Sequence, residues 1–212
     1  MLAALRVVAI TDRRLMVPAA LLDGGDWLAI AAAFGRAVAT AVADCPPGSV
    51  IVQVREKDLD GGPLLQLVRA AQPFAPVLVN DRLDVALAAG AQGVHLPERG
   101  LPVADARVLA PTGFVVGVSR HAAPLDAAAD LIHLGPIWPT PSKPDAVPLG
   151  EPALAWSHAH AILVAVGGID APSRARQAAA AGAAAVATIR AAWSGASLAP
   201  FVAAVENGRA HR

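Results

Sequence analysis

An excess of charge of either sign is missing from this 212-residue chain, in which 17 Lys and Arg balance 17 Asp and Glu. A neutral chain has no general attraction for nucleic acid or for an anionic membrane surface, so we expect neither as a partner. Disulfides within the chain are excluded too, because Cys45 is the only cysteine. A single thiol is typical of the reducing cytoplasm, where we expect this protein.

Long hydrophobic runs are equally scarce. Gly, Pro or a charged residue interrupts each apolar run before it reaches the roughly 18–20 residues that a membrane span requires. The amino terminus lacks a basic leader and reads as a first strand, not as a signal peptide. What the chain does have is apolar content. Its 55 % hydrophobic and 16 % charged residues exclude disorder and predict a single domain over residues 1–212.

Short β-branched runs alternate with alanine-rich helical stretches along the chain. The runs are apolar throughout, which favours parallel strands covered on both faces. We predict strands at Arg6–Thr11, Val50–Val54, Val77–Val79, Gly93–Leu96, Phe114–Val118, Leu131–Leu134, Ile162–Val166 and Ala184–Thr188. We predict helices at Trp27–Ala43, Gly62–Ala71, Leu83–Ala89, Val103–Leu109, Pro124–Ala129, Glu151–Ala159, Pro172–Ala181 and Leu198–Glu206. This alternation predicts an α/β fold, a single (β/α)8 TIM barrel, with an open doubly wound sheet as the alternative.

Polar residues and glycines gather just after the predicted strands. They are Asp12, Arg55, Lys57, Asn80, Asp81, Ser119, His121, Gly167, Gly168 and Arg190. In a closed barrel the carboxyl ends of all strands meet at one rim, where the active sites of such barrels lie. We therefore expect these residues to surround one mouth.

The glycines after the seventh strand point to a phosphate. Gly167 and Gly168 open a helix, so their backbone N–H groups could approach an anion with support from the helix dipole. The alternative is a plain tight turn. Lys143 lies in the long Pro- and Gly-rich loop Gly135–Gly150, a type of segment that often forms lids, and it would close over a phosphate when the loop orders.

Two cations end the second strand. Arg55 and Lys57 lie two residues apart on an extended segment, so they share a face and can meet one polyanion. The alternative is a solvated pair neutralised by Glu56 and Asp58.

Proton transfer and metal binding have one candidate each. His121 follows the fifth strand, and histidine is the side chain that most often serves as a general acid–base catalyst. His95 lies within a strand and fits a hydrogen-bonded barrel histidine. Asp81 is a candidate Mg²⁺ ligand or polar contact, although Asn80 or Asp81 would serve equally as a helix cap. A lone carboxylate is a poor Mg²⁺ site unless substrate phosphates or another oxygen ligand complete it.

These residues together resemble the thiamine phosphate synthase/thiazole tautomerase superfamily over nearly the whole chain. The matching stretches are Ile10–Asp12, Val52–Leu59, Leu78–Leu87, Gly93–Leu96, Gly117–Ser119, Gly135–Lys143 and Val166–Ile169. The family is a TIM barrel, so the resemblance supports that fold independently.

The resemblance implies a pocket for a small phosphorylated thiazole. In the synthase, a pyrimidine diphosphate also binds, ionises with loss of pyrophosphate and is captured by the thiazole nitrogen. The implied pyrophosphate ligands are Arg55, Lys57, Asn80 and Lys143, and Asp81 would be one Mg²⁺ ligand. Gly167, Gly168, Ser119 and the loop through Thr188 and Arg190 would complete the phosphate-binding residues.

One departure separates this chain from the synthase pattern. After the fourth strand the synthase resembles Gly-Gln-Glu-Asp, whose last residue is the second Mg²⁺ ligand, whereas this chain has Pro97-Glu98-Arg99-Gly100. Losing that carboxylate should weaken Mg²⁺ binding, unless Glu98 replaces it. An arginine followed by a small residue looks more like the tautomerase branch, whose acid–base histidine His121 would match. The stretch Pro139–Ala146, by contrast, looks closer to the synthase lid.

We therefore favour a metal-independent thiazole tautomerase that needs no cofactor and moves a proton to give the aromatic carboxythiazole phosphate. The alternative is a Mg²⁺-dependent thiamine phosphate synthase, and the second alternative is a non-catalytic sensor of the phosphorylated ligand. Trp156 and Trp193, expected on exposed helices, would suit a homodimer, although core packing would explain them equally.

Overall fold

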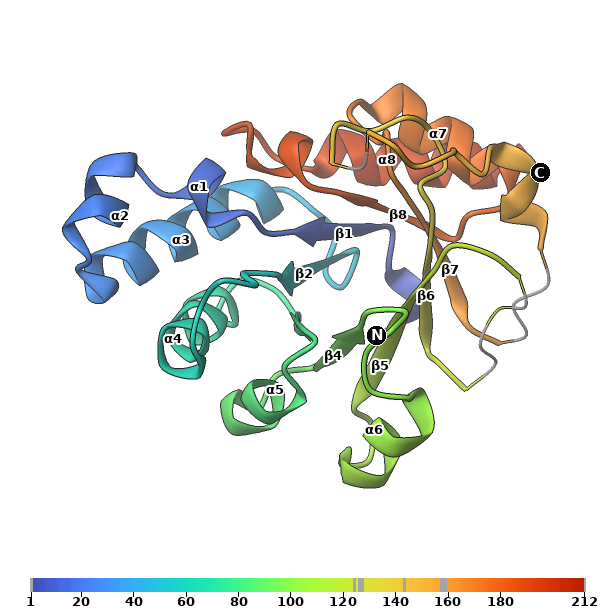
Figure 1. The fold of residues 1–212 in the computed structure, drawn as a ribbon. Coiled ribbons are helices and arrows are strands. Elements are labelled where there is room, and N and C mark those ends of the chain that lie inside the picture. The colour runs from blue at the N-terminus through green and yellow to red at the C-terminus, as the bar shows by residue number, and fades with distance from the viewer. Residues whose placement is uncertain (1, 124, 126–127, 143, 157–159, 212) are drawn as a thin grey trace.

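The computed structural model describes residues 2–123, 125, 128–142, 144–156 and 160–211. Its eight parallel strands close into a barrel in chain order, from β1 to β8 (Figure 1). The strands are β1 (Val7–Ile10), β2 (Val50–Val54), β3 (Val77–Asn80), β4 (Gly93–Leu96), β5 (Val115–Arg120), β6 (Leu131–Leu134), β7 (Ile162–Val166) and β8 (Ala185–Thr188). The predicted TIM barrel is thereby confirmed, and the open sheet is excluded because β1 pairs with β8.

The helices surround the barrel as its outer layer (Figure 1). They are α1 (Arg13–Met16), α2 (Ala19–Gly24), α3 (Trp27–Val42), α4 (Gly61–Ala71), α5 (Leu83–Ala89), α6 (Val103–Leu109), α7 (Pro172–Ala181) and α8 (Ala199–Arg209). The described residues also form three short 3-10 helices, which are η1 (Leu2–Ala4), η2 (Glu151–Ala155) and η3 (Arg190–Trp193). No helix of the described residues is both long and apolar enough to cross a membrane.

Two predicted helices differ in the structure. Residues 123, 125 and 128–130 lie in turns and irregular segments, so Pro124–Ala129 is not a helix in its described part. In place of the helix Glu151–Ala159, the chain forms the one-turn 3-10 helix η2, and residues 157–159 lie outside the described part. Both segments are alanine-rich, and helical propensity alone stabilises such short helices too weakly.

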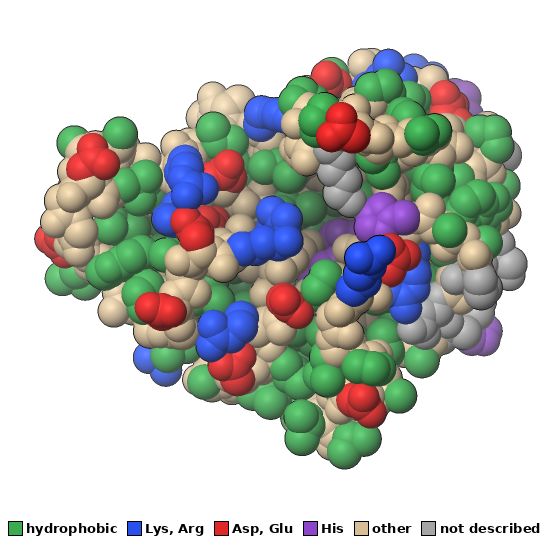
Figure 2. Space-filling view, in the orientation of Figure 1, with side chains coloured by type: hydrophobic (Ala, Val, Ile, Leu, Met, Phe, Trp, Pro, Cys, Tyr) green, Lys and Arg blue, Asp and Glu red, His purple; other side chains and the backbone are tan. Residues whose placement is uncertain are grey.

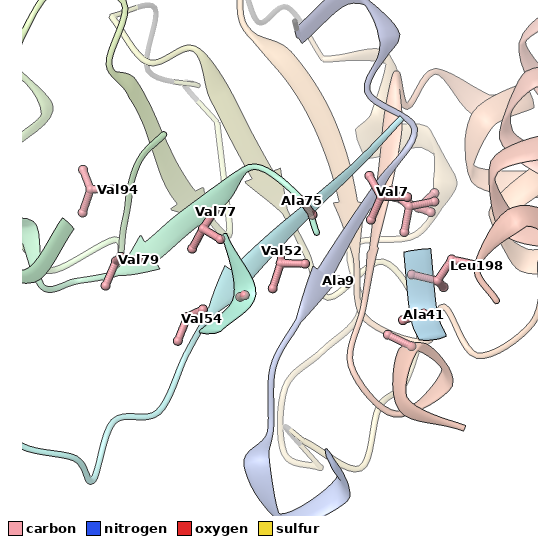
Figure 3. Packing of buried hydrophobic residues seen from close by; sticks show 14 of the residues in the cluster. Val7, Ala9, Ala41, Val52, Val54, Ala75, Val77, Val79, Val94 and Leu198 are labelled. Carbon is pink, nitrogen blue, oxygen red and sulfur yellow. The ribbon is translucent and has the colours of Figure 1, made fainter. Parts of the chain in front are cut away.

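Alternation along each strand divides the core into two layers. Side chains such as Val7, Val52 and Val77 face outward and pack beneath the helices (Figure 3). Their neighbours Val8 and Ile51 face inward and fill the lower barrel. Since both faces are buried, the strands need apolar residues at every position, and this requirement is relaxed only where the barrel opens.

One of the two tryptophans that would suit a homodimer interface, Trp193, is part of the core instead. Trp193 is buried, and its indole Nε1–H donates to the Ile10 carbonyl oxygen over 2.8 Å. Trp156 is half-buried against the core. Core packing therefore accounts for Trp193, which was expected on an exposed helix.

Candidate active site

The parallel barrel brings the predicted polar residues to one rim. Each lies at or just after the carboxyl end of its strand, and all strands point the same way. We call this rim, with the hollow that it encloses, the mouth. Figure 2 shows Lys, Arg and His side chains gathered around a hollow in the centre of the face drawn. Lys143 lies outside the described residues, so its expected place over the mouth stays a prediction.

A hydrogen-bonded network joins the ends of β1 and β2. The carboxylate of Glu56 accepts from Thr11 Oγ1 at 2.7 Å and from the backbone N–H and guanidinium of Arg13, both at 3.0 Å. Arg13 also forms a two-bond pair with Asp58, at 2.7 and 2.8 Å, and Arg14 binds Asp58 at 2.7 Å. We call these five residues the β1–β2 network.

The network takes up Glu56 and Asp58, the two acids that the alternative interpretation paired with Arg55 and Lys57. Glu56 and Asp58 face Arg13 and Arg14, whereas neither Arg55 nor Lys57 has an ion pair within the described part of the chain. The Arg55 N–H is bound by Thr11 Oγ1 at 2.9 Å, which fixes the backbone from which its half-buried side chain starts. The structure thus contradicts the alternative of a neutralised pair.

Burial and ion pairing have opposite effects on the pKa values of Glu56 and Asp58, the two carboxyls of the network. Burial raises the pKa of Glu56, and the hydrogen bonds from Thr11 and Arg13 oppose that rise. At the exposed end, the Arg13 guanidinium holds the pKa of Asp58 far below its usual range. Pairing with Asp58 in turn raises the pKa of Arg13. Arg13 and Asp58 therefore stay charged, and their charges compensate each other.

The barrel floor beneath the mouth has a polar half and an apolar half. The polar half comes from β2 to β6 and consists of Gln53, Asn80, His95, Ser119 and His133. Interior residues of β7, β8 and β1 make the apolar half, namely Val166, Ala187, Ile189 and Ile10. Such a floor suits a flat ligand that carries polar atoms along one edge.

Three polar atoms of this floor have no hydrogen-bond partner among the described residues. They are Gln53 Oε1, His95 Nδ1 and His133 Nε2, each in a buried side chain. The His95 and His133 rings lie 4.0 Å apart between centroids, and His95 Nε2 is 2.9 Å from Ser119 Oγ. Burial lowers the pKa of both imidazoles, that of His133 to about 3, so both rings are neutral at pH 7.

Sequence reasoning missed Gln53 and His133. A usable signal was present, because side chains two residues apart on a strand share a face. Gln53 therefore shares a face with Arg55, and His133 with Gly135.

Asp81 has an unusual backbone conformation in the turn between β3 and α5. Its φ is +66°, in the left-handed region that side chains other than glycine adopt at a cost. Neither Asp81 nor Asn80 caps the next helix, because the N-cap of α5 is Arg82 and it receives no side-chain bond. Asn80 Oδ1 instead accepts from Gln53 Nε2 at 3.1 Å. The helix-cap alternative is therefore wrong, and the exposed carboxylate of Asp81 is available to a ligand.

The donor set does not form a site for a resident Mg²⁺ ion. A Cβ atom at Gly100 would lie 3.1 Å from Asp81 Oδ1, so position 100 does adjoin Asp81, but glycine offers no oxygen there. Glu98 does not fill the gap, because both of its carboxylate oxygens face His121. No group of three or more His, Cys, Asp or Glu side chains in the described residues is arranged so that it could hold a metal ion. One carboxylate would leave Mg²⁺ to be held almost wholly by substrate phosphates and water.

His121 is oriented by Glu98. Its ring Nδ1 lies 2.7 Å from Glu98 Oε2, and its backbone N–H donates to Glu98 Oε1 at 3.2 Å. Burial raises the pKa of Glu98, but the hydrogen bonds and charge of His121, with the charge of Arg120, together outweigh that effect, so the pKa of Glu98 lies below its usual value. A histidine whose one ring nitrogen is held by a carboxylate has a defined tautomer, as acid–base catalysis requires.

The turn after β7 is built on two glycines for steric reasons. Gly167 and Gly168 have φ of +95° and +74°, and a Cβ at Gly168 would lie 2.6 Å from Trp138 Cβ. Thr188 Oγ1 donates to the Ile169 carbonyl at 2.7 Å, so Thr188 fixes this turn from β8. Arg190 follows at the start of η3 with an exposed side chain. The tight turn and a phosphate cradle are therefore compatible interpretations of the same segment.

Comparison with known proteins gives one consistent family. A family model described as thiamine monophosphate synthase matches residues 29–192. A putative thiamine-phosphate synthase of Geobacter sulfurreducens is 43% identical over 171 residues, which cover 74% of this chain and 80% of that protein. The thiamine-phosphate synthase of Methanoculleus marisnigri is 45% identical over 137 residues, 58% of this chain and 65% of the relative, so the chain spans just under two thirds of that relative's length.

A solved structure shows the same likeness in three dimensions. The thiamine phosphate pyrophosphorylase from Pyrococcus furiosus superposes with a TM-score of 0.67 at 25% identity, covering 97% of this chain and 98% of that one. The resemblance found in the sequence is thus confirmed. Because these relatives bear the name of the synthase, they favour the synthase alternative over the tautomerase that we preferred from the sequence.

Proposed function

Because the chain belongs to the thiamine monophosphate synthase family, we propose that it joins a pyrimidine diphosphate to a thiazole phosphate, forming thiamine phosphate and releasing pyrophosphate. One observation of the mouth supports this activity above the others. Arg55 and Lys57 carry positive charge that no acid of the described residues neutralises, since Glu56 and Asp58 are held by Arg13 and Arg14. Two unneutralised cations just beyond the end of one strand suit a diphosphate.

The proposed reaction places charge where these cations lie. The bond between the pyrimidine methylene carbon and the diphosphate oxygen breaks, and its electron pair leaves with pyrophosphate. The lone pair of the thiazole nitrogen then forms the new carbon–nitrogen bond. Arg55 and Lys57 would stabilise the charge that develops on the leaving group, an effect that grows in a site partly closed to water. Asn80 would donate its amide N–H beside them.

The remaining parts of the mouth would position the second substrate. Backbone N–H groups of the Gly167–Gly168 turn, with the exposed cation of Arg190 beside them, would hold the thiazole phosphate. The apolar half of the floor beneath this turn would accept a flat ring. Holding both substrates in one orientation would turn a bimolecular encounter into a reaction within a complex.

The assay uses both substrates and measures thiamine phosphate and released pyrophosphate. Arg55→Met should lower turnover about 100-fold or more, because one preformed charge at the leaving group is lost. Arg82→Met is the matched control, since Arg82 lies at the same rim but its guanidinium is paired with Asp84 at 2.6 Å. Absence of product from the unaltered chain, with and without added Mg²⁺, would contradict the proposal.

A second candidate function rests on the Glu98–His121 contact. An oriented imidazole would move a proton on a carboxylated thiazole phosphate without any metal, which is the tautomerase reaction. Incubation with the non-aromatic tautomer would show whether isomerisation is faster than in buffer. His121→Asn and Glu98→Gln should both lower that rate if this reaction is native, the first by about 10²–10⁴-fold. Unchanged rates in both variants would eliminate the tautomerase.

A further inference from the structure

We infer that the mouth binds a diphosphate through its own cations, without a divalent metal ion to bridge protein and ligand. The inference rests on the proposed function for the nature of the ligand, and it concerns how the ligand is held. Its basis is the arrangement of charged groups around β1 to β4. Within the described residues Arg55 and Lys57 form no ion pair, and Asp81 belongs to no group of three or more His, Cys, Asp or Glu side chains that could hold a metal ion.

The β1–β2 network separates the acids from the cations of the same segment. Along residues 55–58 cations and acids alternate in sequence, and in the structure the acids turn to Arg13 and Arg14. Because Arg13 holds Glu56 and Asp58 with one guanidinium, neither acid is available to Arg55 or Lys57. These two cations can therefore bind phosphate oxygens directly, without first breaking an ion pair.

The carboxylate of Asp81 has no second metal-binding carboxylate beside it on the loop after β4. The position that adjoins its carboxylate is Gly100, and the nearest other acid on that loop, Glu98, is engaged by His121 through both oxygens. One carboxylate attracts Mg²⁺ weakly, while it repels an incoming diphosphate. Asp81 should therefore oppose anion binding when no metal is present, and Mg²⁺ should compete with Arg55 and Lys57 for the same phosphate oxygens.

The two binding modes predict opposite changes in pyrophosphate affinity for Asp81→Asn. Asp81→Asn removes a negative charge from the rim and keeps a residue type that tolerates left-handed backbone. If binding is metal-free, the variant should bind inorganic pyrophosphate about threefold to tenfold more tightly. If Asp81 holds a metal for the ligand, the variant should bind more weakly. Asp44→Asn is the matched control, because Asp44 is also exposed with φ +59° but lies between α3 and β2, at the opposite end of the barrel.

The experiment is calorimetric titration of the full chain with inorganic pyrophosphate, once in a chelator and once in excess Mg²⁺. We expect binding in the chelator, no tightening by Mg²⁺, a tightening by Asp81→Asn and no change by Asp44→Asn. Arg55→Met should weaken binding at least tenfold in the chelator, whereas Arg82→Met should not. Pyrophosphate that binds only with Mg²⁺, or that binds more weakly to Asp81→Asn, would overturn the inference.

Gly100→Asp supplies a test of the reverse change. A second carboxylate beside Asp81 should weaken metal-free binding and make Mg²⁺ enhance it at least tenfold. The new Cβ would also meet the Pro97 ring at 2.8 Å, so thermal unfolding must show a folded variant, and otherwise Asp81→Asn decides alone. A chain that makes thiamine phosphate but needs Mg²⁺ for pyrophosphate would keep the proposed function and lose this inference. Metal-free binding without product would do the opposite.

Discussion

The hydroxyl of Thr11, just beyond β1, is hydrogen-bonded to the side chain of Glu56 and to the backbone of Arg55, just beyond β2. It donates to Glu56 Oε1 at 2.7 Å and accepts from the Arg55 N–H at 2.9 Å. Thr11 and Glu56 are both buried, so neither bond can be replaced by bulk water. This one side chain therefore connects Glu56 to the backbone of Arg55, the cation that we propose to bind the diphosphate.

Thr11→Val should expose the value of this connection. Valine keeps the shape of threonine but removes the hydroxyl, which leaves Glu56 with one donor fewer and the Arg55 N–H without its acceptor. We expect a loss of about 1–3 kcal/mol in the free energy of unfolding, measured by urea denaturation, together with weaker pyrophosphate binding. Thr11→Ser should restore most of both, and equal losses in the two variants would show that packing, not hydrogen bonding, is responsible.

Asp81→Gly should separate stability from activity. Glycine adopts φ +66° without the steric cost that an aspartate side chain carries there, so the free energy of unfolding should rise by up to about 1 kcal/mol. Turnover should fall severalfold, because the rim loses the carboxylate that opposes retention of pyrophosphate. Asp44→Gly has the same backbone geometry and should gain stability without any change in turnover. A fall in turnover for both variants would mean that Asp81 has no special role.

The barrel was predictable because its strands obey a local rule. Strands such as Val50–Val54 and Gly93–Leu96 are apolar at each position except where Gln53 and His95 face the mouth, and their bounds agree with the sequence prediction. The helix predicted at Glu151–Ala159 was wrong in type, because alanine content says little about a segment that forms only one turn before Trp156.

The network at the mouth was not predictable by the same means. Arg13 and Glu56 are 43 residues apart, and nothing in the sequence around Glu56 indicates that its partner comes from α1, a helix that was itself not predicted. Local charge balance left open the alternative that Glu56 and Asp58 neutralise Arg55 and Lys57. The opposite holds because the parallel pairing of β1 with β2 brings the two strand ends together.

The buried histidines should make the protein acid-sensitive. Burial lowers the pKa of His133 to about 3 and that of His95 in the same direction, whereas an unfolded chain protonates histidine near pH 6.5. The unfolded state therefore binds more protons below that pH, and stability falls as pH falls, by up to about 1.4 kcal/mol per unit for each histidine. Urea unfolding at pH 7, 6 and 5 measures the slope. His133→Gln should reduce it by about half, and an unchanged slope would contradict a neutral His133.

Gly168→Ala should disturb the proposed phosphate turn through two separable effects. The φ of +74° strains any alanine, and the new Cβ would meet Trp138 Cβ at 2.6 Å and the Pro139 carbonyl oxygen at 3.2 Å. Gly113→Ala isolates the first effect, because Gly113 has φ +80° with nothing within 4 Å of the added Cβ. We expect about 1 kcal/mol of destabilisation at Gly113 and a further 1–3 kcal/mol at Gly168 from overpacking. Titration with thiazole phosphate should show weaker binding only for Gly168→Ala, since the displaced turn carries the amides proposed to hold that phosphate. Equal affinity in both variants would move the phosphate site away from this turn.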